Sequence, residues 1–263
     1  MASSKRKTAT PKTAEGEQPL PLFYKTPCVL DATRHATATV LSAPNYRFAA
    51  AANSVPLNAV EFSEAGHHYP IVFTPGAKAM PLAVLGLEQS NYFVETSGQW
   101  DAHSYIPAYI RQYPFIFLER PEQDKFYLCI DESAASFQAD GAAGGGGLYN
   151  PDGSPSLLSQ HALEFCKAYY QHHAVTRQMC EDLQQHQLLM PVQSEATLNN
   201  GRTLNLSGFQ MLNESAVQAL SDDVYLDLRR KGWLPFIYLA LASTTNWKRL
   251  MDRANALQAA QAH

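Results

Sequence analysis

Short runs of apolar residues, each bounded by turn formers, dominate the chain from residue 71 to residue 130. Five of these runs are β-branched or aromatic, which is typical of strands; they cover residues 71–74, 82–85, 92–94, 115–118 and 126–130. Pro75-Gly76 favours a type II turn and therefore predicts a hairpin between the first two runs. Parallel neighbours need a long crossover, so connections this short predict an antiparallel sheet.

A different period begins after residue 155. Apolar and small residues recur there every three or four positions, which predicts one long amphipathic helix. The residues of this stripe are Leu158, Ala162, Phe165, Cys166, Tyr169, His173, Thr176, Cys180 and Leu183.

The rest of the chain predicts one hairpin and three more helices. Asn200-Gly201 favours a type I′ turn inside a tight hairpin over residues 198–206. Helices are expected over 213–220 and 222–231, with Gly232 at the position that follows the second, and a last helix from Trp233 toward Leu257. The predicted fold class is α+β, with an antiparallel β-rich N-terminal half and a mainly helical C-terminal half.

Composition sets the boundaries between these parts. Residues 1–21 are rich in Ser, Thr, Lys, Pro and Glu, and we expect a disordered basic tail there. Residues 138–155 contain the glycine run, residues 141–147, and the turn formers Asn150-Pro151-Asp152-Gly153. Both features predict a flexible loop without regular structure. We therefore expect a β-rich half over 22–137 and a helical half over 156–263.

The overall composition is that of a soluble globular protein, with 46% hydrophobic and 17% charged residues. A net charge of −4 gives no reason to expect binding to nucleic acid. The longest apolar run, residues 233–242, is too short for a membrane span and contains Pro235. No apolar segment follows the basic start, so we expect a cytoplasmic protein.

Motifs for covalent catalysis are missing from the sequence. No Gly-x-Ser-x-Gly occurs, and the glycine run lacks the lysine of a phosphate-binding loop. The four cysteines, Cys28, Cys129, Cys166 and Cys180, form no Cys-x-x-Cys pair and are expected to be reduced and buried.

The sequence contains the residue types of metal and acid–base sites, but no spacing that brings them together. His67, His68, Asp101 and His103 include the residue types of an iron site, but adjacent residues on a strand point to opposite faces. We therefore expect no metal and no cofactor. The carboxylates that could act as acids or bases are Glu61, Glu64, Asp101, Asp131 and Glu132, and no spacing among them fixes a two-acid geometry.

The stretch SGQWDAHSYIPAYIRQYP, residues 97–114, holds the candidate ligand-binding residues Trp100, Asp101, His103 and Arg111. Apolar residues at 106, 109, 110 and 113 predict a short helix over 105–113 that is capped by Ser104. Arg111 projects from another face, and we expect it to pair with Asp101 or Glu61.

A series of ordered motifs resembles the SapC family of bacterial proteins over about residues 23–250. They include Glu61-Phe62, Tyr69-Pro70-Ile71-Val72-Phe73-Thr74, Asn91-Tyr92-Phe93-Val94, Gly98-Gln99-Trp100, Tyr105-Ile106-Pro107-Ala108-Tyr109, Tyr113-Pro114-Phe115, Gly208-Phe209 and Leu228-Arg229-Arg230-Lys231-Gly232-Trp233-Leu234. The resemblance implies a protein associated with bacterial surface layers, and it supplies no catalytic residue.

Two hypotheses follow. In the first, the chain is a non-enzymatic accessory protein that binds a protein partner or a small-molecule ligand through its β-rich half. In the second, it is a small-molecule enzyme with a pocket around Trp100, Asp101, His103 and Arg111, in which His67 or His68 serves as base or metal ligand. The oligomeric state is open in both.

Overall fold

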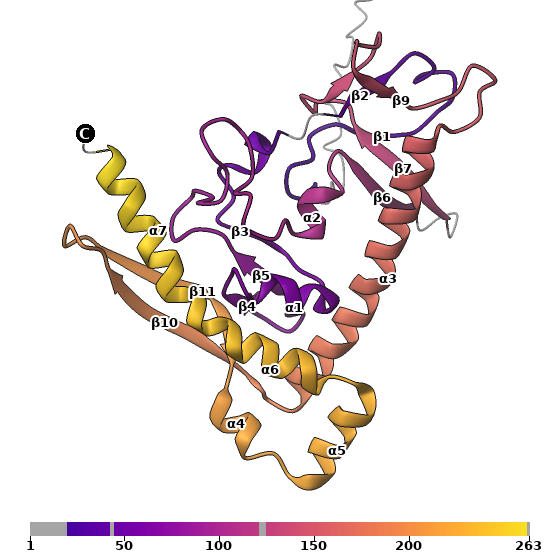
Figure 1. The fold of residues 1–263 in the computed structure, drawn as a ribbon. Helices are drawn as coiled ribbons and strands as arrows, with labels where there is room; N and C mark the ends of the chain where they lie inside the picture. The colour runs from indigo at the N-terminus through magenta and orange to yellow at the C-terminus, as the bar shows by residue number, and fades with distance from the viewer. Residues whose placement is uncertain (1–19, 43–44, 121–124, 262–263) are drawn as a thin grey trace, which may run out of the picture.

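The structure is a computed structural model that describes residues 20–42, 45–120 and 125–261. Antiparallel sheets fill the N-terminal half and most of the helices lie in the C-terminal half, which confirms the predicted fold class (Figure 1). The predicted basic tail lies outside the described residues except for its last two positions.

The strands described form three sheets, in which every pairing is antiparallel. The first has the order β1 (Pro27–Val29), β7 (Lys125–Asp131), β6 (Phe115–Arg120). The second has the order β8 (Phe137–Gln138), β2 (Thr39–Leu41), β9 (Gly145–Gly147). The third has the order β10 (Leu189–Thr197), β11 (Thr203–Leu212), β4 (Ile71–Phe73), β5 (Pro81–Val84), β3 (Ser54–Pro56).

Helices connect and cover these sheets. The short ones are η1 (Arg47–Ala49), η2 (Ala59–Glu61), α1 (Phe62–Ala65), α2 (Ala108–Arg111), α4 (Glu214–Gln218) and η4 (Ser243–Thr245). The longer ones are α3 (Leu157–Gln185), α5 (Asp222–Lys231), α6 (Leu234–Ala242) and α7 (Asn246–Gln261). Figure 1 shows α3 running from the first two sheets to α5 and α6. Among the described helices, none is both long and apolar enough to cross a membrane.

Several predicted elements are confirmed. The β4–β5 and β6–β7 pairs form where short apolar runs predicted antiparallel strands. The long helix α3 begins after Ser156, whose hydroxyl accepts from the Ser159 amide at 3.2 Å. Gly232 ends α5 with a φ of 79°, the left-handed conformation that glycine adopts without a steric penalty.

The glycine run is not the unstructured segment that we expected. Gly145–Gly147 is strand β9 and pairs with β2, so the prediction of no regular structure there is wrong. A Cβ on Gly145 would lie 2.7 Å from the Thr39 hydroxyl. The pairing of β9 with β2 therefore requires residues that have no side chain. Glycine has a low propensity for strands, and for that reason the sequence predicted a flexible loop here.

Residues 92–94 do not form the predicted strand. Only an isolated bridge joins Val94 to Trp100, and the Asn91 side chain accepts from the Phe93 amide at 3.0 Å. This side-chain bond to the backbone two residues on holds the chain in a turn. The local aromatic pattern is therefore explained by core packing, because Phe93 is buried.

The predicted helix over 105–113 is also too long. Only Ala108–Arg111 is helical, and Pro107 rather than Ser104 precedes it. The Ala108 amide donates to the carboxylate of Glu61 at 2.7 Å, so a residue from η2 caps the short helix from outside.

The C-terminal half contains a long hairpin besides its helices. Strands β10 and β11 flank a turn in which the Gly201 amide donates to the Leu198 carbonyl at 2.9 Å. Gly201 has a φ of 83°, whereas Asn200 is not among the positive-φ residues, so the predicted hairpin is confirmed and its type I′ turn is not.

The predicted last helix is interrupted at η4. The hydroxyls of Ser243, Thr244 and Thr245 donate to carbonyls three residues earlier, at 2.6, 2.7 and 2.9 Å. Hydroxyls that bond back to the preceding turn compete with helical hydrogen bonds and divide α6 from α7.

One hydrophobic core joins the two halves of the chain. It contains Val55, Phe62 and Ile71 from the β-rich half and Leu183 and Ile237 from the helical half. A smaller cluster around Leu148 and Cys166 packs under the sheet β8–β2–β9. All four cysteines are free, and Cys129, Cys166 and Cys180 are buried.

The end of α3 is tied to the α5–α6 connection by Asp182. Its carboxylate accepts from the indole nitrogen of Trp233 at 2.7 Å and from Lys231 at 3.0 Å. We expect Asp182→Ala to lower the free energy of unfolding by about 2 kcal/mol, because a buried indole N–H loses its acceptor. Urea unfolding measures the loss, and equal stability of Asp182→Ala and the wild type would contradict the role assigned here.

Candidate functional site

Trp100, the first of the four predicted site residues, lies in the core. Its side chain is only 6% exposed, and its ring stacks on Phe93 with centroids 6.2 Å apart and contacts Tyr46 edge-on. A ring enclosed in this way fixes the position of the following loop.

Asp101 faces helix α7. Its carboxylate binds the guanidinium of Arg253 and accepts from the Ser104 hydroxyl at 3.0 Å and the His103 amide at 3.1 Å. Partial burial opposes ionisation, but these bonds outweigh it and hold the pKa of Asp101 below its ordinary value. Arg253 also lies over the Phe93 ring, 4.2 Å from its centroid.

Arg111 is exposed and bonded elsewhere. Its guanidinium donates to the Ile106 carbonyl at 2.9 Å and to the Tyr105 hydroxyl at 3.1 Å, so the predicted ion pair with Asp101 or Glu61 is wrong. The Tyr105 hydroxyl in turn donates to Glu61 at 3.0 Å. A neutral hydroxyl thus stands between the two charges.

His103 is exposed, and the predicted neighbours His67 and His68 come from the turn after α1. Partial burial and the positive charge of Arg249 lower the pKa of His68, which favours its neutral form. The four predicted residues therefore divide between the core, the α7 contact and the surface. Ligand binding by this group stays a prediction.

A cavity of about 250 Å³ lies elsewhere, over one face of the strands β4, β5 and β3. Val72 and Leu82 are register partners, as are Ser54 and Val84, so their side chains share one face. The alternate positions on these strands, such as Ala83, point to the opposite face, and Val72, Ala83 and Val84 all belong to the core. The sheet thus supplies a mostly aliphatic floor with one hydroxyl.

Strand β11 and helix α7 form a second wall of this cavity. The remaining lining residues are Asn53, Gly86, Leu87, Asn205, Leu206, Ser207, Gly208, Phe209 and Trp247. Phe209 and Trp247 stack with ring centroids 5.7 Å apart, which places an aromatic pair beside neutral amides and hydroxyls. No lining side chain is ionisable.

A β-bulge shapes the β11 wall. Val192 pairs with Phe209 and Gln193 pairs with Ser207, so Gly208 between them has no partner in the ladder. Gly208 has a φ of 84° and open space where a Cβ would stand. The bulge bends β11 away from β4, with which it pairs through Gln210 and Phe73.

Two contacts hold the hairpin tip over the cavity. Arg202 forms an ion pair with Glu88, which follows the lining residue Leu87. The Asn199 amide donates to Asn255 of α7 at 2.9 Å. Figure 1 shows α7 lying alongside the β10–β11 hairpin, and both contacts fasten this wall at the hairpin tip.

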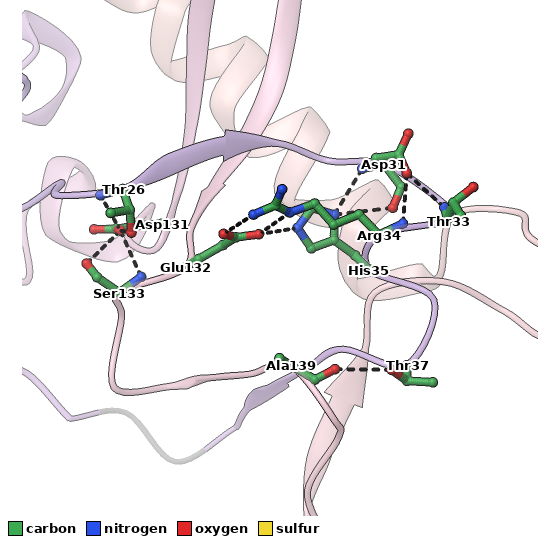
Figure 2. A network of polar contacts seen from close by, with 10 residues as sticks. All are labelled: Thr26, Asp31, Thr33, Arg34, His35, Thr37, Asp131, Glu132, Ser133 and Ala139. Carbon is green, nitrogen blue, oxygen red and sulfur yellow. Dashed lines mark hydrogen bonds and ion pairs between the residues drawn. The ribbon is translucent and has the colours of Figure 1, made fainter.

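A polar network lies at the end of the sheet β1–β7–β6 at which β7 ends (Figure 2). Asp131, at the end of β7, is fully buried and accepts from the backbone and hydroxyl of Thr26 at 3.0 and 3.1 Å. The next residue, Glu132, binds Arg34 through two bonds of 2.7 and 2.6 Å and His35 at 3.0 Å. Asp131 and Glu132, two of the candidate acids or bases, therefore both bond to residues that precede β2.

Sequence reasoning missed both the cavity and the partners of this network. The lining comes from five segments between residues 53 and 247, which no local spacing brings together. The signals available were Gly208 within an alternating strand, which marks a bulge, and Trp247 at a half-buried helix position.

The SapC family model matches residues 30–250, and the chain belongs to the SapC family. This confirms the resemblance found in the motifs. No curated protein and no solved structure matches the chain.

Proposed function

We propose that this SapC-family protein is a non-enzymatic accessory protein that binds an uncharged small molecule in the cavity between the β3–β5–β4 sheet and β11. The observation that carries the proposal is the composition of the lining. Aliphatic side chains, one stacked aromatic pair and neutral amides and hydroxyls suit a ligand with an apolar face and a few polar groups.

Charge argues against an ionic ligand. A buried charge needs an opposite charge or several hydrogen bonds, and no ionisable side chain lines the cavity. The same feature favours binding over catalysis, because the lining holds neither a general acid nor a general base. An enzyme built on Trp100, Asp101, His103 and Arg111 would need Arg111 to leave Tyr105 and Ile106.

Binding of an uncharged dye tests the proposal. We expect one N-phenyl-1-naphthylamine per chain to bind and brighten, and Trp247→Ala to weaken binding about 5- to 10-fold, because aromatic stacking contributes about 1–1.5 kcal/mol. Fluorescence titration measures the affinity. The anionic analogue 8-anilino-1-naphthalenesulfonate should bind more weakly than the uncharged dye.

The matched control is Tyr238→Ala, which removes an exposed aromatic ring that does not line the cavity. Its affinity for the dye should equal that of the wild type. Equal affinities of wild type and Trp247→Ala, or preference for the anionic dye, would contradict the assignment of the cavity as the binding site.

An accessory role adds a protein partner and a location to the proposal. The family name supports association with a bacterial surface layer, and a cytoplasmic location is the alternative that we favour from the sequence. Affinity purification from the native host with mass spectrometry should return a specific complex. Recovery of the protein alone, at native expression levels, would argue against the accessory role.

A further inference from the structure

Cys28, His35 and Glu132 bring a thiol, an imidazole and a carboxylate to one place. One ligand atom from each lies within 4.8 Å of the others. Strand pairing causes this convergence: β1 carries Cys28 and pairs with β7, which ends one residue before Glu132. The loop that follows β1 turns His35 back onto the same carboxylate.

We propose that these three residues form a zinc site, separate from the cavity and independent of the proposed function. Thiolate and imidazole ligands with one carboxylate suit Zn²⁺, which takes four ligands in a tetrahedron. Ligand atoms around Zn²⁺ are roughly 3.3–3.8 Å apart at its usual bond lengths. The His35–Glu132 separation of 3.0 Å and the common limit of 4.8 Å require only small side-chain adjustments.

His35 already has the supporting contact that a zinc-bound histidine needs. Its ring is 1% exposed, and Nδ1 lies 3.2 Å from the Asp31 carbonyl oxygen. With the proton on Nδ1 bonded to that carbonyl, the lone pair of Nε2 points to Glu132 and the metal. The Asp31 amide, 3.1 Å from Nδ1, supports the other tautomer when no metal is bound.

Without a metal, the positive charge next to Glu132 is that of Arg34. Its guanidinium holds both oxygens of Glu132, and its side chain is 59% exposed, so it can turn outward without losing buried contacts. On binding, the Cys28 S–H bond is replaced by an S–Zn bond and the proton leaves to solvent, while the His35 proton moves from Nε2 to Nδ1. Water fills the fourth position.

No local spacing in the sequence indicates the proposed site. His67 and His68 are adjacent and His103 lies two residues from Asp101, whereas Glu132 lies 97 residues from His35. Neither Cys28 nor His35 belongs to a local zinc motif. Only the β1–β7 pairing makes them neighbours.

Calorimetric titration of the full chain with Zn²⁺, after purification in chelator, tests the site. We expect one Zn²⁺ per chain, and at least about 100-fold weaker binding in Cys28→Ser and in Glu132→Gln, since loss of a ligand should exceed the loss caused by an outer contact. Arg34→Ala should bind more tightly than the wild type, because it frees both oxygens of Glu132.

The controls are Cys180→Ala and His103→Ala, which remove a thiol and an imidazole outside the site and should leave Zn²⁺ binding unchanged. Co²⁺ gives a second readout, because a thiolate–cobalt absorption band should form in the wild type and be lost in Cys28→Ser even when the variant stays folded by circular dichroism. Absence of Zn²⁺ binding to the wild type, or binding that persists in Cys28→Ser, would overturn the proposal.

Discussion

Asp131→Ala is expected to lower the free energy of unfolding by about 3 kcal/mol, and the melting temperature by roughly 6–12 °C. The Asp131 carboxylate accepts six hydrogen bonds, from the backbone and hydroxyl groups of Thr26 and Ser133, the Lys25 amide and the Tyr113 hydroxyl. Lys25 and Thr26 precede β1, Tyr113 lies just before β6, and Ser133 lies just after β7. Losing the carboxylate therefore loosens the whole sheet.

The same residue makes stability depend on pH. Burial opposes ionisation of Asp131, but its hydrogen bonds from Ser133, Lys25 and Thr26 outweigh burial and lower its pKa in the folded state. A lowered pKa contributes stability above the unfolded-state value of about 3.9, and the contribution is lost as the pH falls through the folded-state pKa. Asp131→Asn should therefore lose most stability near neutral pH and least in acid.

Asp152→Ala provides the control for Asp131. Asp152 is also an aspartate that accepts from a serine two residues on, but it is exposed in a loop. Thermal unfolding at several pH values should show little change for Asp152→Ala. A melting temperature for Asp131→Ala within 2 °C of the wild type would show that the network does not hold the sheet.

Glu61→Ala is expected to cost about 3 kcal/mol as well. Its side chain is 5% exposed and accepts from the Asn58 amide at 2.9 Å, the Tyr105 hydroxyl at 3.0 Å and the Ala108 amide at 2.7 Å. Two of these donors are buried backbone groups that lose their acceptor on truncation. Glu61 thereby joins η2 to α2 across the core.

Glu61→Gln should also destabilise, because an amide group would face donors with its own N–H bonds. Glu64→Gln, on the exposed side of the adjacent helix α1, should change stability by less than about 0.5 kcal/mol. Chemical unfolding of the three variants separates these cases. Equal stability of Glu61→Ala and Glu64→Gln would contradict the stabilising role assigned to Glu61.

Local elements could be predicted where neighbouring residues decide them. The stripe from Leu158 to Leu183 predicted α3, and Gly232 marked the end of α5, because both depend on contacts within a few residues. Strand β9 could not be predicted, since its pairing with β2 uses backbone groups and needs glycine for close approach.

Candidate sites were harder, because their partners are distant along the chain. Asp101 was a candidate ligand-binding residue, but its partner Arg253 is 152 residues away. Arg111 was expected to pair with Asp101 or Glu61, but the Tyr105 hydroxyl lies between Arg111 and Glu61. The cavity depends on the bulge at Gly208 and on α7 crossing β11. Sequence patterns report which residues are unusual, and the fold decides which of them meet.

The central claim is that the cavity beside Trp247 binds an uncharged small molecule. The most direct measurement is mass spectrometry of the compounds that the purified protein captures from an extract of its native host, with Trp247→Ala and Tyr238→Ala treated alike. We predict one uncharged compound, bound near one per chain by wild type and Tyr238→Ala and depleted in Trp247→Ala. No captured compound, or equal capture by Trp247→Ala, would contradict the claim.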